Sequence, residues 1–241
     1  MLYLFQKGFH YSQDGPGNRL IYHLQGCNLR CPWCSNPEGL SLTGGTGYPI
    51  SELVDEVLRS RPMFFDGGGL TLTGGEVMMQ ADGAIKLLSA VHEAGVNTCI
   101  ETNGLSARLP ELFPVLDHLI MDVKHYDPSR HRAVTGMENS VTCENLALAL
   151  KAGMDVLVRI PLIGCFNASV EDAHAFASLL SSLGMKECGR LELLTYHEYG
   201  KAKYENLGLP YRMDESARIT PEMLTQFTDV IRASGIQLIK T

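Results

Sequence analysis

Three of the chain's seven cysteines lie within eight positions, in the segment GCNLRCPWCSN at residues 26–36. Cys27, Cys31 and Cys34 are separated by three and then by two residues, and no fourth cysteine follows nearby. A closed structural zinc site takes four ligands, whereas three thiolates can hold three irons of a [4Fe–4S] cluster and leave the fourth iron open. The spacing therefore predicts an iron–sulfur centre with one open coordination position.

The same cysteines have two other interpretations. His10 or His23 could complete a zinc site, but neither histidine belongs to a pair with the spacing of zinc ligands. A redox-active Cys31-Pro-Trp-Cys34 pair would leave Cys27 without a role. The cluster is favoured over both alternatives.

Composition narrows the class of protein. The chain has 241 residues, 45% of them hydrophobic and 20% charged, which is ordinary for a globular protein and enough for one large α/β domain. The formal net charge of −7 disfavours nucleic-acid binding, and no apolar stretch is long enough to cross a membrane. The first residues, MLYLFQKG, have no basic region or cleavage site, so we expect a cytoplasmic protein with reduced thiols.

Short apolar runs alternate with longer amphipathic segments along the chain. The predicted strands cover residues 18–25, 69–73, 96–102, 118–123, 155–161 and 190–196, with a last strand at 236–241. The predicted helices cover residues 49–60, 81–95, 142–153, 170–184 and 220–235. Apolar strands that are separated by helices indicate a parallel sheet covered by helices.

The six main strands each end in, or carry, residues that could do chemistry. These are Gly26-Cys27, Gly74-Gly75-Glu76, Glu101-Thr102-Asn103-Gly104, Asp122-Val123-Lys124, Arg159 and Tyr196-His197-Glu198. In a (β/α) barrel, the site is assembled from the carboxyl ends of several strands, whereas an open sheet uses one crevice. The pattern favours a barrel, full or partial, in a single domain that covers residues 1–241.

Several of these residues also have ordinary structural explanations. Gly74-Gly75 is a common turn, and Asp122 and Lys124, two residues apart, would form an ion pair on one side of a strand end. The remaining cysteines are isolated, and we expect them to be small buried side chains: Cys99, Cys143, Cys165 and Cys188.

The cysteine spacing is the signature of the radical S-adenosylmethionine (SAM) superfamily, and further segments narrow the resemblance. They are DGPGNRLIYHLQGC (14–27), GGGLTLTGGE (67–76), TCIETNG (98–104), MDVKHYD (121–127), VRIPLIG (158–164) and LLTYHEYGKAKYENLG (193–208). Together they resemble the glycyl radical enzyme activating enzymes, in order and over nearly the whole chain. The resemblance implies a partial (β/α)6 barrel. It also implies an anaerobic oxidoreductase that cleaves SAM reductively and takes a hydrogen atom from a backbone glycine of a partner glycyl radical enzyme.

The resemblance also assigns roles around one [4Fe–4S] cluster and SAM, with no side chain acting as a catalytic group of its own. The open iron would bind the amino and carboxylate groups of SAM, and flavodoxin or ferredoxin would supply electrons. The residues implied in SAM binding are Trp33, Gly74, Gly75, Glu76, Glu101, Asp122, Lys124, Arg159 and His197.

Within that set, Gly74, Gly75 and Glu76 would face the SAM amino group. Asp122 and Lys124 would lie at its ribose and carboxylate, and Arg159 would add a positive charge. His197 would lie near the adenine. Trp33 is the aromatic residue before the third cysteine.

The resemblance implies further roles for two positions. Glu101 stands where the family often has Asp, a position that can help to hold a monovalent cation. In the family, the segment that matches the one containing Asp14 contacts the glycine loop of the partner enzyme, so the resemblance implies partner binding for Asp14.

The chain departs from the family pattern near the cluster motif. Only 32 residues separate Cys34 from Gly67 and none is a cysteine, so we expect no ferredoxin-like insert and a single cluster. Yet CPWCSNPE is more similar to insert-bearing activases, because Ser35 stands where pyruvate formate-lyase activases typically have His. The two features disagree about the partner enzyme.

Two alternative functions stay open from the sequence. One is a radical SAM enzyme that acts on a small molecule, similar to 7-carboxy-7-deazaguanine synthase. The motif at residues 196–201 is evidence against it. The other is a zinc-stabilised binding protein without catalysis.

Overall fold

The structure is a computed structural model that describes residues 1–239, and it divides into two compact units. Unit 1 comprises Met1–Asn28 and Glu38–Ile120. Unit 2 comprises Leu29–Pro37 and the described part of Met121–Thr241. The expectation of a single radical SAM domain over residues 1–241 stays a prediction.

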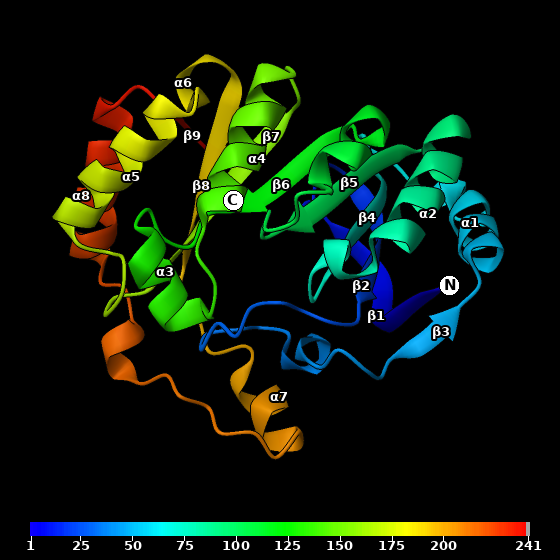
Figure 1. The fold of residues 1–241 in the computed structure, drawn as a ribbon, viewed down its shortest axis with the longest axis horizontal. Coiled ribbons are helices and arrows are strands. Elements are labelled where there is room, and N and C mark those ends of the chain that lie inside the picture. The colour runs from blue at the N-terminus through cyan, green and yellow to red at the C-terminus, as the bar shows by residue number, and fades with distance from the viewer. Residues whose placement is uncertain (240–241) are drawn as a thin grey trace. The chain divides into compact units, whose positions relative to one another are not determined.

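Unit 1 is built on five strands in the order β3-β1-β2-β4-β5 (Figure 1). They are β1 (Leu2–Tyr11), β2 (Asn18–Leu24), β3 (Thr46–Tyr48), β4 (Gly69–Gly74) and β5 (Asn97–Thr102). As predicted, β2, β4 and β5 are parallel, whereas β1 runs antiparallel to both β2 and β3. Strands β1 and β3 are absent from the sequence prediction.

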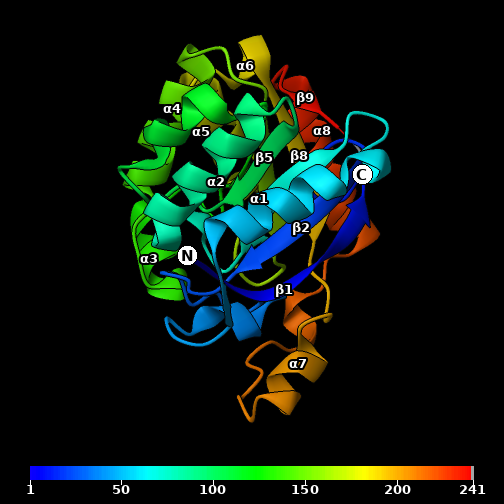
Figure 2. The ribbon, with the colours of Figure 1, turned by 90° about the vertical axis from the view of Figure 1, so that its right-hand side faces the viewer.

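The two faces of this sheet differ in chemistry. Helices α1 (Ile50–Arg59) and α2 (Ala81–Glu93) lie side by side over one face (Figure 2). Buried Tyr22 of β2 reaches α1 on that side, where its hydroxyl donates to Glu56 at 2.9 Å. The opposite face is polar, because strand alternation turns Arg19, Thr71 and Glu101 away from the helices. Short 3-10 turns complete the unit at Arg61–Met63, Val77–Gln80 and Leu109–Val115, and another spans Pro37–Leu40.

Unit 2 contains the parallel strands β7 (Val156–Leu162), β8 (Gly189–Thr195) and β9 (Gln237–Leu238). The division between the units falls within β6 (His118–Asp122). The helices of unit 2 are α3 (Pro128–Thr135), α4 (Ser140–Lys151), α5 (Val170–Ser182), α6 (Met185–Cys188), α7 (Lys201–Asn206) and α8 (Pro221–Ala233). A 3-10 turn lies at Glu215–Ala217. Buried aliphatic side chains of β7 and β8 alternate with Arg159 and Glu192, which lie on the opposite face of both strands.

Local sequence explains where several helices begin and end. The Thr220 hydroxyl accepts from Met223 N–H at the start of α8, with Pro221 in the first turn. Ser169 and Asp172 form a reciprocal capping box on α5. The predicted final strand is confirmed only at Gln237–Leu238, and residues 240–241 of that prediction lie outside the described residues.

The prediction for the isolated cysteines is partly wrong. Cys99 on β5 is buried, as expected, and Cys143 is half-buried. Cys165 and Cys188 are exposed, because one lies in the loop after β7 and the other ends the short helix α6, which the sequence analysis missed. Within residues 1–239, no helix is long and apolar enough to cross a membrane.

Candidate functional site

Cys27 follows β2 in unit 1 and is held by close backbone contacts. Gly26 N–H donates to the Gly39 carbonyl at 3.0 Å, and Glu76 N–H donates to the Gly26 carbonyl at 2.8 Å. A Cβ on Gly75 would lie only 2.2 Å from the Gly26 oxygen, so this position requires glycine. Gly75, which directly follows β4, therefore has a packing role: it lets the chain approach the carbonyl of Gly26, the residue before Cys27.

Cys31 and Cys34 belong to unit 2, where the segment Leu29–Pro37 packs on the rest of the unit. Cys34 N–H donates to the Cys31 carbonyl at 3.1 Å, which closes a tight turn. Arg30 N–H donates to the Thr135 carbonyl at the end of α3, at 2.8 Å. The backbone N–H of Asn36 points at the Cys34 sulfur, at 3.4 Å. The turn thus presents two thiols in a fixed backbone frame.

Trp33 anchors this turn in an apolar cluster. Its ring lies 5.2 Å from the ring of Phe166, and both pack with Ile163 and Ala217. His125 lies behind Phe166, with ring centroids 4.8 Å apart. The packing of Trp33 in this cluster therefore positions the turn that carries Cys31 and Cys34.

Glu76 is a buried carboxylate that joins the ends of β4 and β5. It accepts from the Thr102 hydroxyl at 2.6 Å, from Asn103 N–H at 2.8 Å and from Met78 N–H at 3.0 Å. These bonds fix the loop that follows β5. The predicted ligand Glu101 lies at the same end of β5, where it accepts from the Thr73 hydroxyl at 2.9 Å.

Asp122 and Lys124 do lie on one side of the end of β6, and they form an ion pair of 2.7 Å. Lys124 is buried rather than solvated, so the pair is more than a surface contact. The buried side chain of Asn167 donates to the carbonyls of Lys124 and Pro161, both at 2.9 Å. Asn167 connects the end of β6 to β7, and no local sequence pattern predicts this role.

Arg159 forms a buried ion pair with Glu192, its neighbour across β7 and β8, at 2.6 Å from Nε to Oε2. The other carboxylate oxygen of Glu192, Oε1, has no hydrogen bond partner among the described residues. A buried acceptor of this kind is costly unless a donor reaches it. Sequence reasoning missed Glu192, although a lone glutamate in the apolar run RLELL was a signal.

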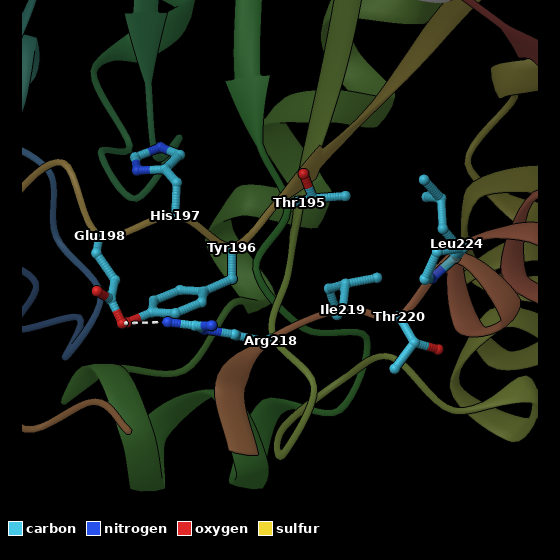
Figure 3. A pocket seen from close by; sticks show the side chains of 9 residues that line it. Thr195, Tyr196, His197, Glu198, Arg218, Ile219, Thr220 and Leu224 are labelled. Carbon is cyan, nitrogen blue, oxygen red and sulfur yellow. Dashed lines mark ion pairs between the residues drawn. The ribbon is translucent and has the colours of Figure 1, made fainter. Parts of the chain in front are cut away.

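His197 lines a pocket of about 580 Å³ in unit 2, at the carboxyl end of β8 (Figure 3). The pocket also contains Tyr196 and the ion pair of Glu198 with Arg218, at 3.6 Å. The His197 ring stacks on Tyr199 at 4.0 Å. Burial lowers the pKa of His197, so the neutral imidazole is favoured near neutral pH.

Asp14 lies in unit 1, in the turn between β1 and β2. Its carboxylate is 2.7 Å from Nδ1 of His10, and its carbonyl accepts from the Thr71 hydroxyl at 2.7 Å. Fully buried Arg19 holds the same turn by donating to the Pro16 carbonyl and to Thr71. The turn is therefore built on β2 and β4 and is not a plain surface loop.

The predicted residues thus fall into two groups, which the structure describes separately. Unit 1 holds Cys27, Gly74, Gly75, Glu76, Glu101 and Asp14, and unit 2 holds Cys31, Trp33, Cys34, Asp122, Lys124, Arg159 and His197. Most lie at the carboxyl ends of strands, as the sequence predicted, whereas Arg159 lies mid-strand and Asp14 lies before β2.

Comparison with known proteins identifies the class. Residues 21–177 match the Radical SAM superfamily. The pyruvate formate-lyase-activating enzyme of Clostridium pasteurianum is 34% identical over 203 residues, which cover 83% of this chain and 84% of that protein. The choline trimethylamine-lyase activating enzyme of Oleidesulfovibrio alaskensis is 30% identical, with 91% of each chain covered.

Solved structures agree in fold. Streptococcus suis SuiB bound to its precursor peptide SuiA gives a TM-score of 0.67 at 15% identity, covering 90% of this chain and 46% of SuiB. A radical SAM methyltransferase from Sphaerobacter thermophilus gives 0.64 at 17% identity, covering 97% and 72%. The expected fold class, an α/β partial (β/α)6 barrel of the radical SAM type, is confirmed.

The chain belongs to the radical SAM superfamily and, within it, to the family of glycyl radical enzyme activating enzymes. Its cofactors are accordingly a [4Fe–4S] cluster and SAM as cosubstrate. The donor set fits this cluster: the thiols are soft ligands, and the N–H of Asn36 is aimed at one sulfur. Burial and then the charges of Cys34 and Cys31 raise the pKa of Tyr204 to about 12, so a neutral phenol lies beside them.

Proposed function

We propose that this protein activates a glycyl radical enzyme by taking a hydrogen atom from one glycine of that enzyme. The observation that carries the proposal is the similarity to two activating enzymes at 30% identity or more over most of each chain, with the three cysteines of the cluster motif in place. Pyruvate formate-lyase and choline trimethylamine-lyase are the enzymes named for those relatives. The partner of this chain is proposed only as a member of that class.

Cys27, Cys31 and Cys34 would hold the cluster. SAM would bind at the iron that no cysteine coordinates. When bound, the cluster supplies one electron that cleaves SAM into methionine and the 5′-deoxyadenosyl radical that accepts the glycine hydrogen. A flavodoxin or ferredoxin would supply that electron, in the reducing cytoplasm.

The protein's own residues would bind and orient SAM. The carbonyls at Gly74 and Gly75 would accept from the SAM amino group, next to Glu76. Glu101 would stand where relatives can hold a monovalent cation.

In unit 2, the pair of Asp122 and Lys124 would bind the ribose and carboxylate of SAM. Arg159 would add positive charge, and Glu192 Oε1 is a buried acceptor beside it. Neutral His197 and the ring of Trp33 would contact the adenine.

Asp14 would contact the partner's glycine loop. Its carboxylate is already oriented by His10, and its backbone by Thr71. A carboxylate held in this way can accept from a backbone N–H of an incoming peptide.

The test is electron paramagnetic resonance of anaerobically loaded protein with SAM, a strong reductant and a candidate glycyl radical enzyme. We expect a carbon-centred glycyl doublet, with one 5′-deoxyadenosine formed per radical. A candidate enzyme whose glycine is replaced by alanine serves as the control. SAM cleavage that is stimulated only by a small molecule, with no doublet in any glycyl radical enzyme, would overturn the proposal.

A further inference from the structure

Helix α7, which follows β8 in unit 2 (Figure 1), packs on the turn that carries two of the cysteines. The contact is close at its start: a Cβ on Gly200 would lie 2.5 Å from the Cys34 carbonyl oxygen. One turn later, Tyr204 is buried and lies within electrostatic reach of Cys34 and Cys31. This helix is therefore part of the surroundings of the cysteine turn.

Two hydrogen bonds in series lead from α7 to a cysteine sulfur. Lys203 Nζ donates to the side-chain oxygen Oδ1 of Asn36 at 3.0 Å. The backbone N–H of Asn36 in turn lies 3.4 Å from Cys34 Sγ. Lys203 thus holds the side chain of Asn36, whose backbone N–H faces the Cys34 sulfur. Its ammonium group also places a positive charge next to the residue that contacts this sulfur.

We propose that Lys203, acting through Asn36, raises the reduction potential of the cluster that Cys34 helps to hold. The inference rests on the proposed function, which supplies the cluster. Reduction adds one negative charge to the iron–sulfur unit, and hydrogen bonds to its sulfurs stabilise the reduced state. A nearby cation acts in the same direction, because its attraction to the cluster grows with the added charge. Lys203 is a positioning residue in this proposal, because it acts through Asn36.

A purely structural role of the same contact predicts something different. Suppose that Lys203 only attached α7 to the cysteine turn. Replacing Lys203 would then lower the stability of the protein or the fraction of molecules that hold a cluster. The reduction potential of the cluster in those molecules would stay unchanged. The potential therefore separates the two roles.

The experiment is an anaerobic redox titration of the loaded protein, without SAM or partner, followed by electron paramagnetic resonance of the reduced cluster. The variants are Lys203→Met and Asn36→Ala, singly and together. Lys201→Met is the matched control, since it removes the same charge from an exposed position on the same helix. The signal comes only from molecules that hold a cluster, so incomplete loading does not affect the midpoint.

For Lys203→Met we expect a more negative midpoint, by an amount that lowers the ratio of reduced to oxidised cluster about tenfold at a fixed potential. That change corresponds to about 59 mV for a one-electron couple. Lys203→Arg should keep most of the wild-type value. In the Asn36→Ala background, Lys203→Met should shift the midpoint less than in the wild type, because the two residues act along one path.

Equal midpoints in the wild type and Lys203→Met would overturn the inference. So would an equal shift in Lys201→Met, because net charge would then explain the effect. A wild-type protein that holds the cluster yet activates no glycyl radical enzyme would contradict the proposed function instead. The two failures are thus distinguishable.

Discussion

Arg19 shows how much a single buried charge can organise in this chain. It is the largest of the fully buried side chains and lies on the polar face of the unit 1 sheet. Its guanidinium donates to the Thr71 hydroxyl at 2.7 Å, to the Leu70 carbonyl at 2.8 Å and to the Asn97 side chain at 2.8 Å. Weaker bonds reach Pro16 and, on the other side, Gly67. The turn that contains Asp14 is therefore fixed by a planar fork of donors.

Replacing Arg19 should consequently destabilise unit 1. Arg19→Met leaves several buried oxygens without donors, and we expect a loss of about 2–4 kcal/mol in the free energy of unfolding. Arg19→Lys should recover only part of it, because an ammonium group has three donors and cannot reproduce the fork. Urea titration followed by circular dichroism measures both variants.

Arg59→Lys, an exposed change on α1, is the control for the Arg19 variants. If Arg19→Lys were as stable as the wild type, the fork geometry would not matter. In that case, a buried positive charge alone would hold the turn.

At the scale of elements, most of the fold was predicted from the regular spacing of apolar residues along the sequence. All six main strands and all five helices predicted from the sequence are present, with ends that agree within a few residues. Their signals were long apolar or amphipathic runs with clear ends, such as Thr220-Pro221 before α8. For such segments, local sequence and tertiary packing require the same structure.

The elements that were missed have weaker local signals. Strand β1 has an irregular pattern of burial, because only part of it lies in the core, and a register shift interrupts its pairing with β2. Helix α7 has six residues, too few to show helical periodicity. Both are defined by what they pack against, which single-sequence patterns do not contain.

For the candidate site, the roles assigned to single residues stay predictions. Cysteine spacing is local, so the motif of Cys27, Cys31 and Cys34 can be read from the sequence. Lys203 and Asn36 are 167 positions apart in the sequence, and no local pattern connects them. Polar partners of this kind appear only once the chain is folded.

The loop after β6 and helix α5 share a buried histidine whose titration should affect stability. His125 packs against Tyr126, Phe166 and Phe176, and its Nδ1 accepts from Asp127 N–H at 2.9 Å. Burial, and then the charge of Arg130, lowers the pKa of His125 from 6.5 to about 4.

Between pH 6.5 and pH 4, the unfolded state therefore binds the proton and the folded state does not. Unfolding free energy should fall as the pH drops through this window, by up to about 1.4 kcal/mol per pH unit for this group. His125→Asn keeps an acceptor for Asp127 and removes the titration. The variant should be less stable at pH 7 and should lose less stability between pH 7 and pH 5.

Urea titrations at the two pH values check the His125 prediction. Other histidines also contribute, since burial lowers the pKa of His131 as well. The comparison of wild type with variant isolates His125. Parallel pH profiles would contradict the assignment of this sensitivity to His125.

At the scale of the whole molecule, the cysteines of the motif are a small part of the apolar core, although Cys27 and Cys31 are buried. The buried core of each unit consists of strand and helix side chains, among them Leu72 and Leu88 in unit 1 and Ile160 and Phe176 in unit 2. The turn with Cys31 and Cys34 is held by backbone hydrogen bonds and by Trp33. Folding of the described chain should therefore not depend on the cysteine sulfurs.

Cys31→Ala should then separate chemistry from folding. We expect far-UV circular dichroism like that of the wild type, but loss of the cluster and of all SAM cleavage, because two thiolates cannot hold three irons of the cluster. Cys165→Ala, which changes an exposed cysteine outside the motif, should keep both iron content and cleavage. Iron and sulfide analysis with quantified 5′-deoxyadenosine checks each variant. If Cys31→Ala retained cleavage, the assignment of Cys31 as a cluster ligand would be wrong. If Cys165→Ala lost it, the chemistry would depend on a residue that neither the motif nor the fold places there.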